Sequence, residues 1–274
     1  KDNADIKFIY YYLSNKLKPV LELQKLGNTM PYIKLGMLTD FAIPLPPIEI
    51  QKEIVEQIEV KQKAIEGAKQ VIENLERERR YFGQSLRKLE NVDMTEIGTI
   101  CNLINGRAFK PEDWEDKTSG GLPIIRIQNL NNPNSDFNYY SGKVKDDILI
   151  KNGDLLFSWS GSRGTSFGAH IWYGQDAILN QHIFKVVHKE NINRNYLYHA
   201  LNDAVNEIEQ NLHGGVGLVH ITKGNLEKIK IPIPKIDDQL KIVSEVQEEL
   251  EVIEANKKLI HLMQKKIEDV LSEI

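Results

Sequence analysis

The sequence predicts a mixed α/β (α+β) globular domain joined to a long antiparallel two-helix coiled coil. Three observations support this fold class: a segment that recurs with an offset of 188 residues, a heptad pattern that follows each copy, and a stretch between them rich in glycine and asparagine. Composition is that of an ordinary globular protein. The predicted boundaries divide the chain into 1–47, 48–92, 93–235 and 236–274.

The repeat covers the entrance to each predicted long helix. Residues 42–58 (AIPLPPIEIQKEIVEQI) match residues 230–246 (KIPIPKIDDQLKIVSEV), and the pattern of 8–13 (FIYYYL) recurs at 196–201 (YLYHAL). Agreement over a helix, a loop and a second helix indicates a duplication. The repeated identities include Ile43, Pro44, Pro46, Ile48, Gln51, Ile54 and Val55, which recur as Ile231, Pro232, Pro234, Ile236, Gln239, Ile242 and Val243.

The repeated prolines predict an edge strand or an extended segment before each helix. Proline cannot donate to a sheet ladder and holds the residue before it in an extended conformation. Glu49 and Asp237 follow where each helix should begin, and acidic groups suit the positive end of a helix dipole. The two copies therefore predict the same strand-to-helix entrance.

Apolar residues then recur every 3 or 4 positions for about five heptads, which is the pattern of a coiled coil. Polar residues at three of these positions, Lys61, Glu249 and Asn256, are expected to fix the register. The globular stretch between the helices lets the chain return, which favours antiparallel pairing, although periodicity alone fits a coiled coil that only dimerises the protein equally well. The predicted helix–helix seam consists of Ile54, Ile58, Ile65, Ile72, Leu75, Phe82, Leu86, Ile242, Val246, Ile253, Ile260, Met263 and Ile267.

Residues 93–235 read as short strands separated by long loops, followed by one helix at about 195–212. Several loops carry groups suited to DNA: arginine matches guanine edges, asparagine and glutamine match adenine edges, and serine matches phosphate or base. The strands are expected at 99–104, 123–127, 154–159, 169–172 and 182–187. The candidate DNA-binding residues are Asn105, Arg107, Lys110, Arg126, Asn129, Ser160, Ser162, Arg163, Asn180, Gln181 and Lys223.

Some of these residues have an equally good structural interpretation. Arg126 follows a predicted strand and fits a structural ion pair, whereas Asn180 and Gln181 fit the cap of a turn. His182 and His220 are interpreted as packing or turn residues rather than metal ligands. Trp159, Trp172 and Asp154 are interpreted as core aromatics and a turn residue.

Charge and motifs restrict the function further. The net charge is −4, which argues against a simple electrostatic DNA binder, but residues 236–274 alone carry 5 basic and 10 acidic groups. DNA affinity must then come from a local patch, which predicts weak binding without a partner. Neither a phosphate-binding loop nor a nucleophile elbow nor a set of metal ligands can be found, so no enzyme is expected.

The single cysteine, Cys101, cannot form an internal disulfide and is interpreted as a small buried residue. A cytoplasmic protein is therefore expected. No apolar run approaches the roughly 18 residues that a membrane helix needs.

The duplicated entrances resemble the conserved regions of type I restriction-modification specificity subunits. The segments NGRAFK, NGDLLFSWSGSRGT, LNQHIFKV and GGVGLVHITKGNL resemble one of that family's target recognition domains. The resemblance implies that 93–235 is a complete target recognition domain and that the coiled coil separates two such domains as a ruler. About 40 helical residues span roughly 60 Å, more than the roughly 34–36 Å turn of B-DNA.

What the resemblance implies about function is specific. The chain would read one half of a bipartite site in double-stranded DNA and dock methyltransferase subunits on its helices, and a restriction subunit can join. It would hold no cofactor itself, since S-adenosylmethionine belongs to the methyltransferase, which flips the adenine out of the duplex. The alternatives are a coiled-coil scaffold whose globular domain binds a non-DNA partner, and a chain that is itself a methyltransferase.

The chain departs from the family pattern before the first helix. Only residues 1–47 precede it, which match the end of a first target recognition domain, so we expect a remnant of that domain. A remnant should need cover for its apolar residues Phe8, Ile9, Tyr12 and Leu13, for instance by a second copy in a homodimer.

Overall fold

The structure is a computed structural model, and the residues in it form two compact units. Lys1–Arg77 and Glu248–Ile274 make up one of them, called the helical unit below, and Glu78–Gln247 make up the other, called the sheet unit. The remnant, most of the first helix and the end of the second helix thus belong to one unit. The described residues are 3–19, 35–80, 92–132, 135–161, 166–211 and 219–274.

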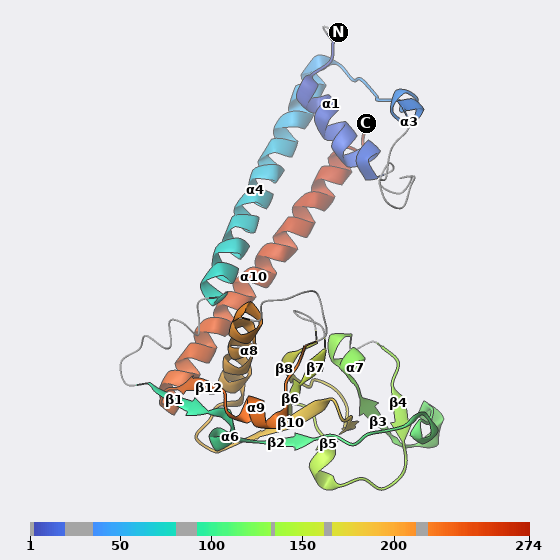
Figure 1. Cartoon of the computed structure of the whole chain (residues 1–274). Coiled ribbons are helices and arrows are strands. Elements are labelled where there is room, and N and C mark those ends of the chain that lie inside the picture. Colours follow the sequence, from blue (N-terminus) through green and yellow to red (C-terminus); the bar gives the residue numbers. More distant parts are fainter. Residues whose placement is uncertain (1–2, 20–34, 81–91, 133–134, 162–165, 212–218) are drawn as a thin grey trace. The chain divides into compact units, whose positions relative to one another are not determined.

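The helical unit contains two long helices, α4 (Ile48–Arg80) and the later part of α10 (Ile236–Val270), beside a short helix α1 (Ile6–Tyr12). The start of α4 packs against the end of α10, so the two helices run antiparallel there (Figure 1). Two smaller elements complete the described part of this unit, η1 (Leu13–Leu17) and α3 (Leu35–Thr39).

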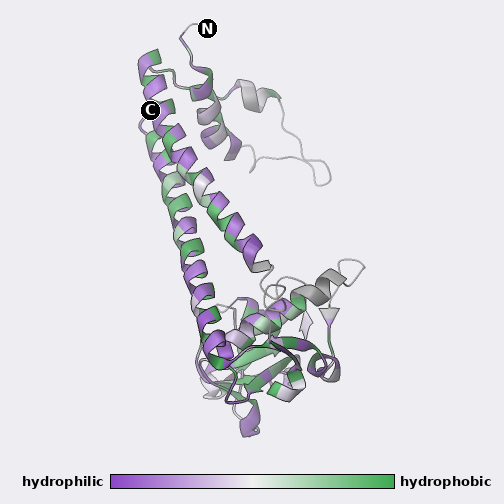
Figure 2. Cartoon of the chain, turned by 90° about the vertical axis from the view of Figure 1, so that its left-hand side faces the viewer, coloured by the Kyte–Doolittle hydropathy of each residue, from purple (hydrophilic) through white to green (hydrophobic). Residues whose placement is uncertain are grey.

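Heptad positions of both helices lie on their buried sides. Ile54, Ile58, Ile65 and Ile267 belong to one buried cluster, and polar Lys61 is half-buried within the same periodicity. Apolar residues recur along both helices in Figure 2. The remaining predicted seam residues of the helical unit are buried or half-buried, namely Ile72, Leu75, Ile253, Ile260 and Met263.

The predicted seam needs one correction at its head. Ile242 packs against the core of the sheet unit rather than on the helix–helix seam, because α10 begins inside that unit. Val246 is buried. Phe82 and Leu86 lie outside the described residues.

The apolar residues of the remnant are covered from within the chain. Phe8 is fully buried in a cluster with residues of α4 and α10, and Ile9 and Tyr12 pack partly buried against the same cluster. The need for a second copy to cover them is therefore not supported. The large apolar side chains that α1 exposes are Ile6 and Tyr10.

The sheet unit is built on two four-stranded sheets. The first, in the order β2-β10-β6-β8, is antiparallel throughout, and the second, in the order β4-β3-β9-β5, has one parallel pair, β3 with β9. The two-stranded pairs β1-β12 and β7-β11 complete it. The strands are β1 (Asp93–Glu96), β2 (Cys101–Asn105), β3 (Leu122–Ile125), β4 (Asn138–Tyr140), β5 (Leu149–Ile150), β6 (Leu155–Ser158), β7 (Ser160–Gly161), β8 (Gly168–Ile171), β9 (Ala177–Leu179), β10 (Ile183–His188), β11 (Val219–His220) and β12 (Lys230–Ile233).

Helix α8 (Arg194–Asn211) packs on the first sheet, and its buried residues share one core with that sheet. A second core fills the other sheet around the fully buried Ile124, Ile150 and Leu179. Short helices connect the strands: α6 (Ile97–Ile100), η2 (Pro111–Asp113), η3 (Lys117–Ser119), α7 (Ile127–Asn131), η4 (Asp146–Ile148) and α9 (Lys223–Glu227).

The repeat keeps its offset of 188 residues in the structure. Helices α1 and α8 begin at Ile6 and Arg194, and α4 and α10 begin at Ile48 and Ile236. Both ends of α3 correspond to both ends of α9 in the same way. The duplicated sequence therefore encodes the same succession of helices in each unit.

One buried glutamine in each unit makes the same three hydrogen bonds. In the sheet unit, the Gln239 amide nitrogen donates to the carbonyls of Pro234 (2.9 Å) and Asn191 (3.3 Å), while its oxygen accepts from the backbone N–H of Asn193 (2.8 Å). Each of these residues has its counterpart 188 positions earlier. Gln51 donates to Pro46 (2.7 Å) and Asn3 (2.9 Å) and accepts from Asp5 (2.7 Å).

The two copies differ beside these glutamines. Residues 41–47 form no described strand, whereas their counterpart contains β12, because β12 pairs with β1 and β1 has no equivalent 188 residues earlier in this sequence. A second difference lies at Tyr196, whose hydroxyl donates to the buried carbonyl of Pro232 (2.7 Å), since its counterpart is Phe8.

Tyr196→Phe should lower the free energy of unfolding by about 1–2 kcal/mol, because the carbonyl of Pro232 would lose its partner inside the core. Chemical denaturation measures this change. Tyr198→Phe, at a half-buried position, is the control and should have a much smaller effect. Equal midpoints for wild type and Tyr196→Phe would contradict the role of the hydroxyl.

Candidate nucleic-acid interface

Several candidate residues meet at one edge of the first sheet. Because its strands are antiparallel, the ends of β2 and β6 and the starts of β10 and β8 lie at the same edge. This edge, called the loop edge below, is marked by Asn105, Ser158, Gly168 and Ile183. Asn105 is exposed there.

The loop edge joins two segments that are far apart in the sequence. Arg107 forms a parallel bridge with Asn180, and its N–H donates to the Leu179 carbonyl (3.0 Å). Gly106 makes this approach feasible, because a Cβ at this position would overlap the backbone of Asn180 and Leu179. The motifs NGRAFK and LNQHIF are thus parts of a single structure.

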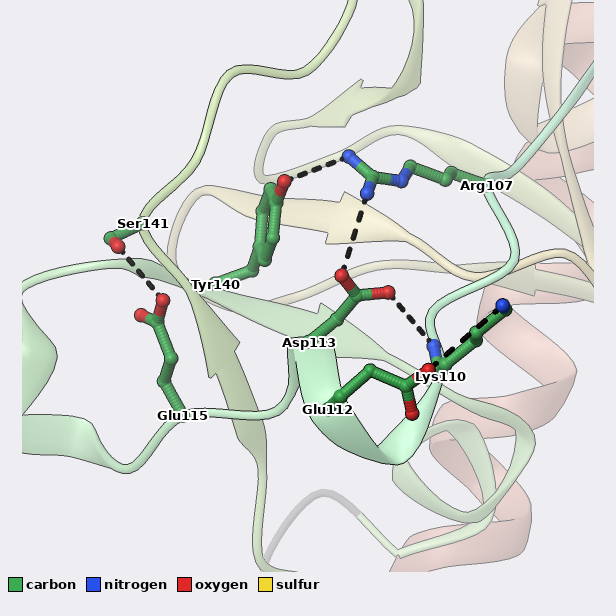
Figure 3. Close-up of polar contacts among 7 residues, drawn as sticks. All are labelled: Arg107, Lys110, Glu112, Asp113, Glu115, Tyr140 and Ser141. Carbon is green, nitrogen blue, oxygen red and sulfur yellow. Dashed lines mark hydrogen bonds and ion pairs between the residues drawn. The ribbon is translucent and has the colours of Figure 1, made fainter.

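Arg107 is held by its neighbours (Figure 3). Its guanidinium lies over the rings of Phe109 (5.0 Å) and Tyr140 (4.7 Å), donates to the Tyr140 hydroxyl (3.0 Å) and lies 3.6 Å from Asp113. These contacts restrict the side chain, which is about one third exposed. A planar cation fixed in this way is suited to a positioned contact rather than a mobile one.

Lys110 differs from Arg107 in that its ammonium group is largely exposed. Its backbone N–H donates to Asp113 (2.9 Å), which holds the loop, and its side chain lies 3.9 Å from Glu112. An ion pair of that length between exposed groups contributes little. Lys110 can therefore meet a phosphate without losing a strong internal partner.

Arg126 and Asn129 lie together beyond the end of β3, and the structure corrects the assignment of Asn129. Asn129 is buried, accepts from the Arg126 N–H (3.0 Å) and donates to Ser135 and Asp136, so it fixes a loop and cannot reach a base. The guanidinium of Arg126 lies over the Trp114 ring (5.1 Å). The expected ion pair for Arg126 is replaced by this stacking contact.

A second correction concerns Asn180, which is buried beside the exposed part of its turn. Its side chain accepts from the N–H of Gln181, as the cap of a turn would. Gln181 is half-buried, and its carbonyl accepts from the indole of Trp159 (3.0 Å). Of this pair, only Gln181 has a side chain placed to meet a ligand.

Two further candidates lie near the loop edge. Ser160 is half-buried in β7, opposite His220 of β11. Lys223 is exposed in the first turn of α9 and lies 3.7 Å from Glu227. Ser162 and Arg163 lie outside the described residues.

Three aromatic groups at this interface were not predicted to belong to it. Tyr140 lies 33 residues from Arg107, and nothing in the sequence relates the two. Trp114 and Trp159 occur in motifs already singled out, but an aromatic residue in a strand-rich domain usually predicts core. Their polar partners, Arg126 and Gln181, could not be identified before the loops were placed.

The described residues show little that would support chemistry of the chain's own. Burial, with a smaller contribution from Glu227, raises the pKa of Cys101 to about 12, so its thiol is not a ready nucleophile. Within the described ranges, no group of three or more His, Cys, Asp or Glu side chains could hold a metal ion. In the same ranges, no helix is long and apolar enough to cross a membrane.

Comparison with known proteins identifies one family. The model of the family described as "Type I restriction modification DNA specificity domain" matches residues 1–77 and 89–265. The specificity subunit of the type I restriction enzyme EcoBI from Escherichia coli is 30% identical over 150 residues, which cover 54% of this chain and 30% of that subunit. The MjaVIII specificity subunit from Methanocaldococcus jannaschii is 24% identical over 96% of this chain and 69% of its own length.

Solved structures show the same fold. The HsdS subunit from Thermoanaerobacter tengcongensis superposes with a TM-score of 0.58 at 17% identity, over 99% of this chain and 70% of that one. The type I restriction-modification S subunit from M. genitalium gives a TM-score of 0.54 at 18% identity, over 98% and 72%. The mixed α/β architecture with two long helices is therefore a known one.

Proposed function

Because the chain belongs to the family described as type I restriction modification DNA specificity domain, we propose that it is the sequence-reading subunit of a type I restriction-modification complex. It reads one half of a bipartite site in double-stranded DNA through the sheet unit. Methyltransferase subunits dock on its long helices, and a restriction subunit joins them. The chain spans 30% of the E. coli relative and about seven tenths of the others, so the activity of a complete subunit forms part of this proposal.

The loop edge is the observation that supports this function best. It brings Asn105, Arg107 and Gln181 from separate segments to one edge of a rigid sheet. Polar side chains on loops fixed by a scaffold are the usual means of reading base edges. Few cations are exposed there, which agrees with weak binding in the absence of a partner.

A duplex-binding assay with the methyltransferase partner present tests the proposal. We expect affinity for one bipartite sequence to exceed affinity for unrelated duplexes by at least about 10³-fold. Both affinities should fall as salt concentration rises. Equal affinity for all duplexes in the presence of the partner would refute the proposal.

Lys110→Glu and Lys223→Glu should weaken binding to every duplex to a similar extent, because both ammonium groups are exposed and contact phosphate in this proposal. Each change should lower the slope of log affinity against log salt by about 1. Lys151→Glu is the control, because Lys151 is exposed at the opposite end of the first sheet. An unchanged slope for both test variants would remove these lysines from the interface.

The remaining parts of the proposal concern partners and catalysis. We expect S-adenosylmethionine to bind the methyltransferase and not this chain, so calorimetry with the isolated chain should show no heat of binding. Specificity subunits are generally non-catalytic, which agrees with this expectation. A cytoplasmic location remains a prediction from cysteine usage.

Two alternatives give different results in the same experiments. A coiled-coil scaffold with a non-DNA partner is not favoured by the family, and it would show no duplex preference. A homodimer through the incomplete first domain would appear as twice the chain mass in light scattering. Because Phe8 is already buried, such a dimer would have to use the exposed Ile6 and Tyr10.

A further inference from the structure

The turn at the loop edge holds Gln181 by its backbone from two sides. The Gln181 carbonyl accepts from the indole of Trp159 (3.0 Å), and its N–H donates to the Asn180 side chain. Trp159 is itself fixed, since its N–H donates to the His182 carbonyl (3.2 Å) and its carbonyl accepts from Ile221 (3.0 Å). The direction in which the Gln181 side chain leaves the turn is therefore set by the fold.

The side-chain amide of Gln181 has a partner in the next residue. Its nitrogen lies 3.2 Å from Nε2 of His182. An amide nitrogen only donates, so Nε2 must accept, and the neutral imidazole then carries its proton on Nδ1. The Trp159 ring lies 5.1 Å from the imidazole between centroids, which restricts the ring. The contact leaves the amide oxygen and one N–H of Gln181 for a ligand.

We propose that Gln181 reads an adenine and that His182 and Trp159 are positioning residues that fix its amide. Adenine offers an acceptor at N7 and a donor at N6 in the major groove, which match one amide N–H and the amide oxygen. Guanine has the acceptor O6 in place of that donor, so the oxygen of Gln181 would face another oxygen. This inference rests on the proposed function, because it requires that the sheet unit reads duplex DNA.

The arrangement explains why a turn carries so many internal contacts. A free glutamine loses up to about 2 kcal/mol of side-chain entropy when it is fixed. Here the fold fixes the turn and His182 fixes the amide before DNA arrives, so that loss does not oppose binding. The orientation of the amide decides between adenine and guanine, and His182 sets that orientation.

Selection from a randomised duplex library, with the methyltransferase partner present, tests the inference. We expect Gln181→Ala to lower the preference for A·T at a single position by roughly 5- to 150-fold and to leave the other positions unchanged. His182→Phe keeps a ring beside Trp159 but cannot accept, so it should relax that same position. The matched control is Gln175→Ala, because the exposed Gln175 also accepts from an indole, that of Trp172 (2.9 Å), at the opposite end of β8.

The outcomes separate the inference from the function on which it rests. If the wild-type complex shows no sequence preference, both fail. If the wild type is specific and Gln181→Ala keeps every preference, the inference alone fails. If Gln181→Ala weakens binding to all duplexes, Gln181→Glu decides: an altered preference at one position supports the inference, and an unaltered one overturns it. Different positions for Gln181 and His182 variants would overturn the role of His182.

Discussion

Gly106→Ala is expected to lower the free energy of unfolding of the sheet unit by about 3 kcal/mol and to abolish specific DNA binding. The added Cβ would overlap the carbonyl of Asn180 and crowd that of Leu179. Both are backbone atoms in a core strand and its turn, so they cannot move aside as a flexible side chain would. Thermal unfolding should show a midpoint lowered by on the order of 6–12 °C.

Gly67→Ala provides the matched control for this experiment. Gly67 lies within α4, and a Cβ there would meet no atom within 4 Å. Alanine should stabilise the helix by about 0.5–1 kcal/mol, so the same substitution should have opposite signs at the two positions. A sheet unit that tolerates Gly106→Ala with its full stability would show that the two segments at the loop edge do not need their close approach.

Gln51→Ala and Gln239→Ala should each cost about 3 kcal/mol, although they lie in different units. Both glutamines are fully buried, and each change removes three hydrogen bonds to backbone groups at a helix entrance. The backbone N–H groups of Asp5 and Asn193 would lose their acceptors. Hydrogen exchange should localise each loss of protection to the unit that carries the substitution.

Gln57→Ala, at an exposed position of α4, is the control and should change stability by less than about 0.5 kcal/mol. A cost at Gln239 with none at Gln51 would mean that the two entrances share geometry but not energetics. A loss of protection throughout the chain for either variant would instead show that the two units unfold together.

The sequence predicts the long helices and the repeat well because both depend on local patterns. The heptads place Ile54, Ile58 and Ile65 on a buried side, and the offset of 188 recurs at the helix starts. The five predicted strands of the head each overlap an observed strand. Strands such as β4, β5 and β9 were missed, since each has two or three residues and owes its pairing to distant segments.

The candidate site is harder to predict, because it depends on which loops meet. The polar residues of two motifs indicated the correct segments, yet Asn129 and Asn180 hold those segments in place from inside. Asparagine serves both purposes with the same chemistry, so the residue type alone cannot separate a base reader from a turn cap. The role of Gln181 emerges only when Trp159 is seen beside it.

The shared phase of the two helix entrances has a consequence for the gene. Since α1 and α8, α3 and α9, and α4 and α10 begin 188 residues apart, the chain enters and leaves that stretch in the same local conformation. A coding segment of this length can be deleted, duplicated or exchanged in frame while each junction keeps its glutamine contacts. The loops between the junctions are then free to diverge, so a new recognition sequence can arise by recombination in a single event.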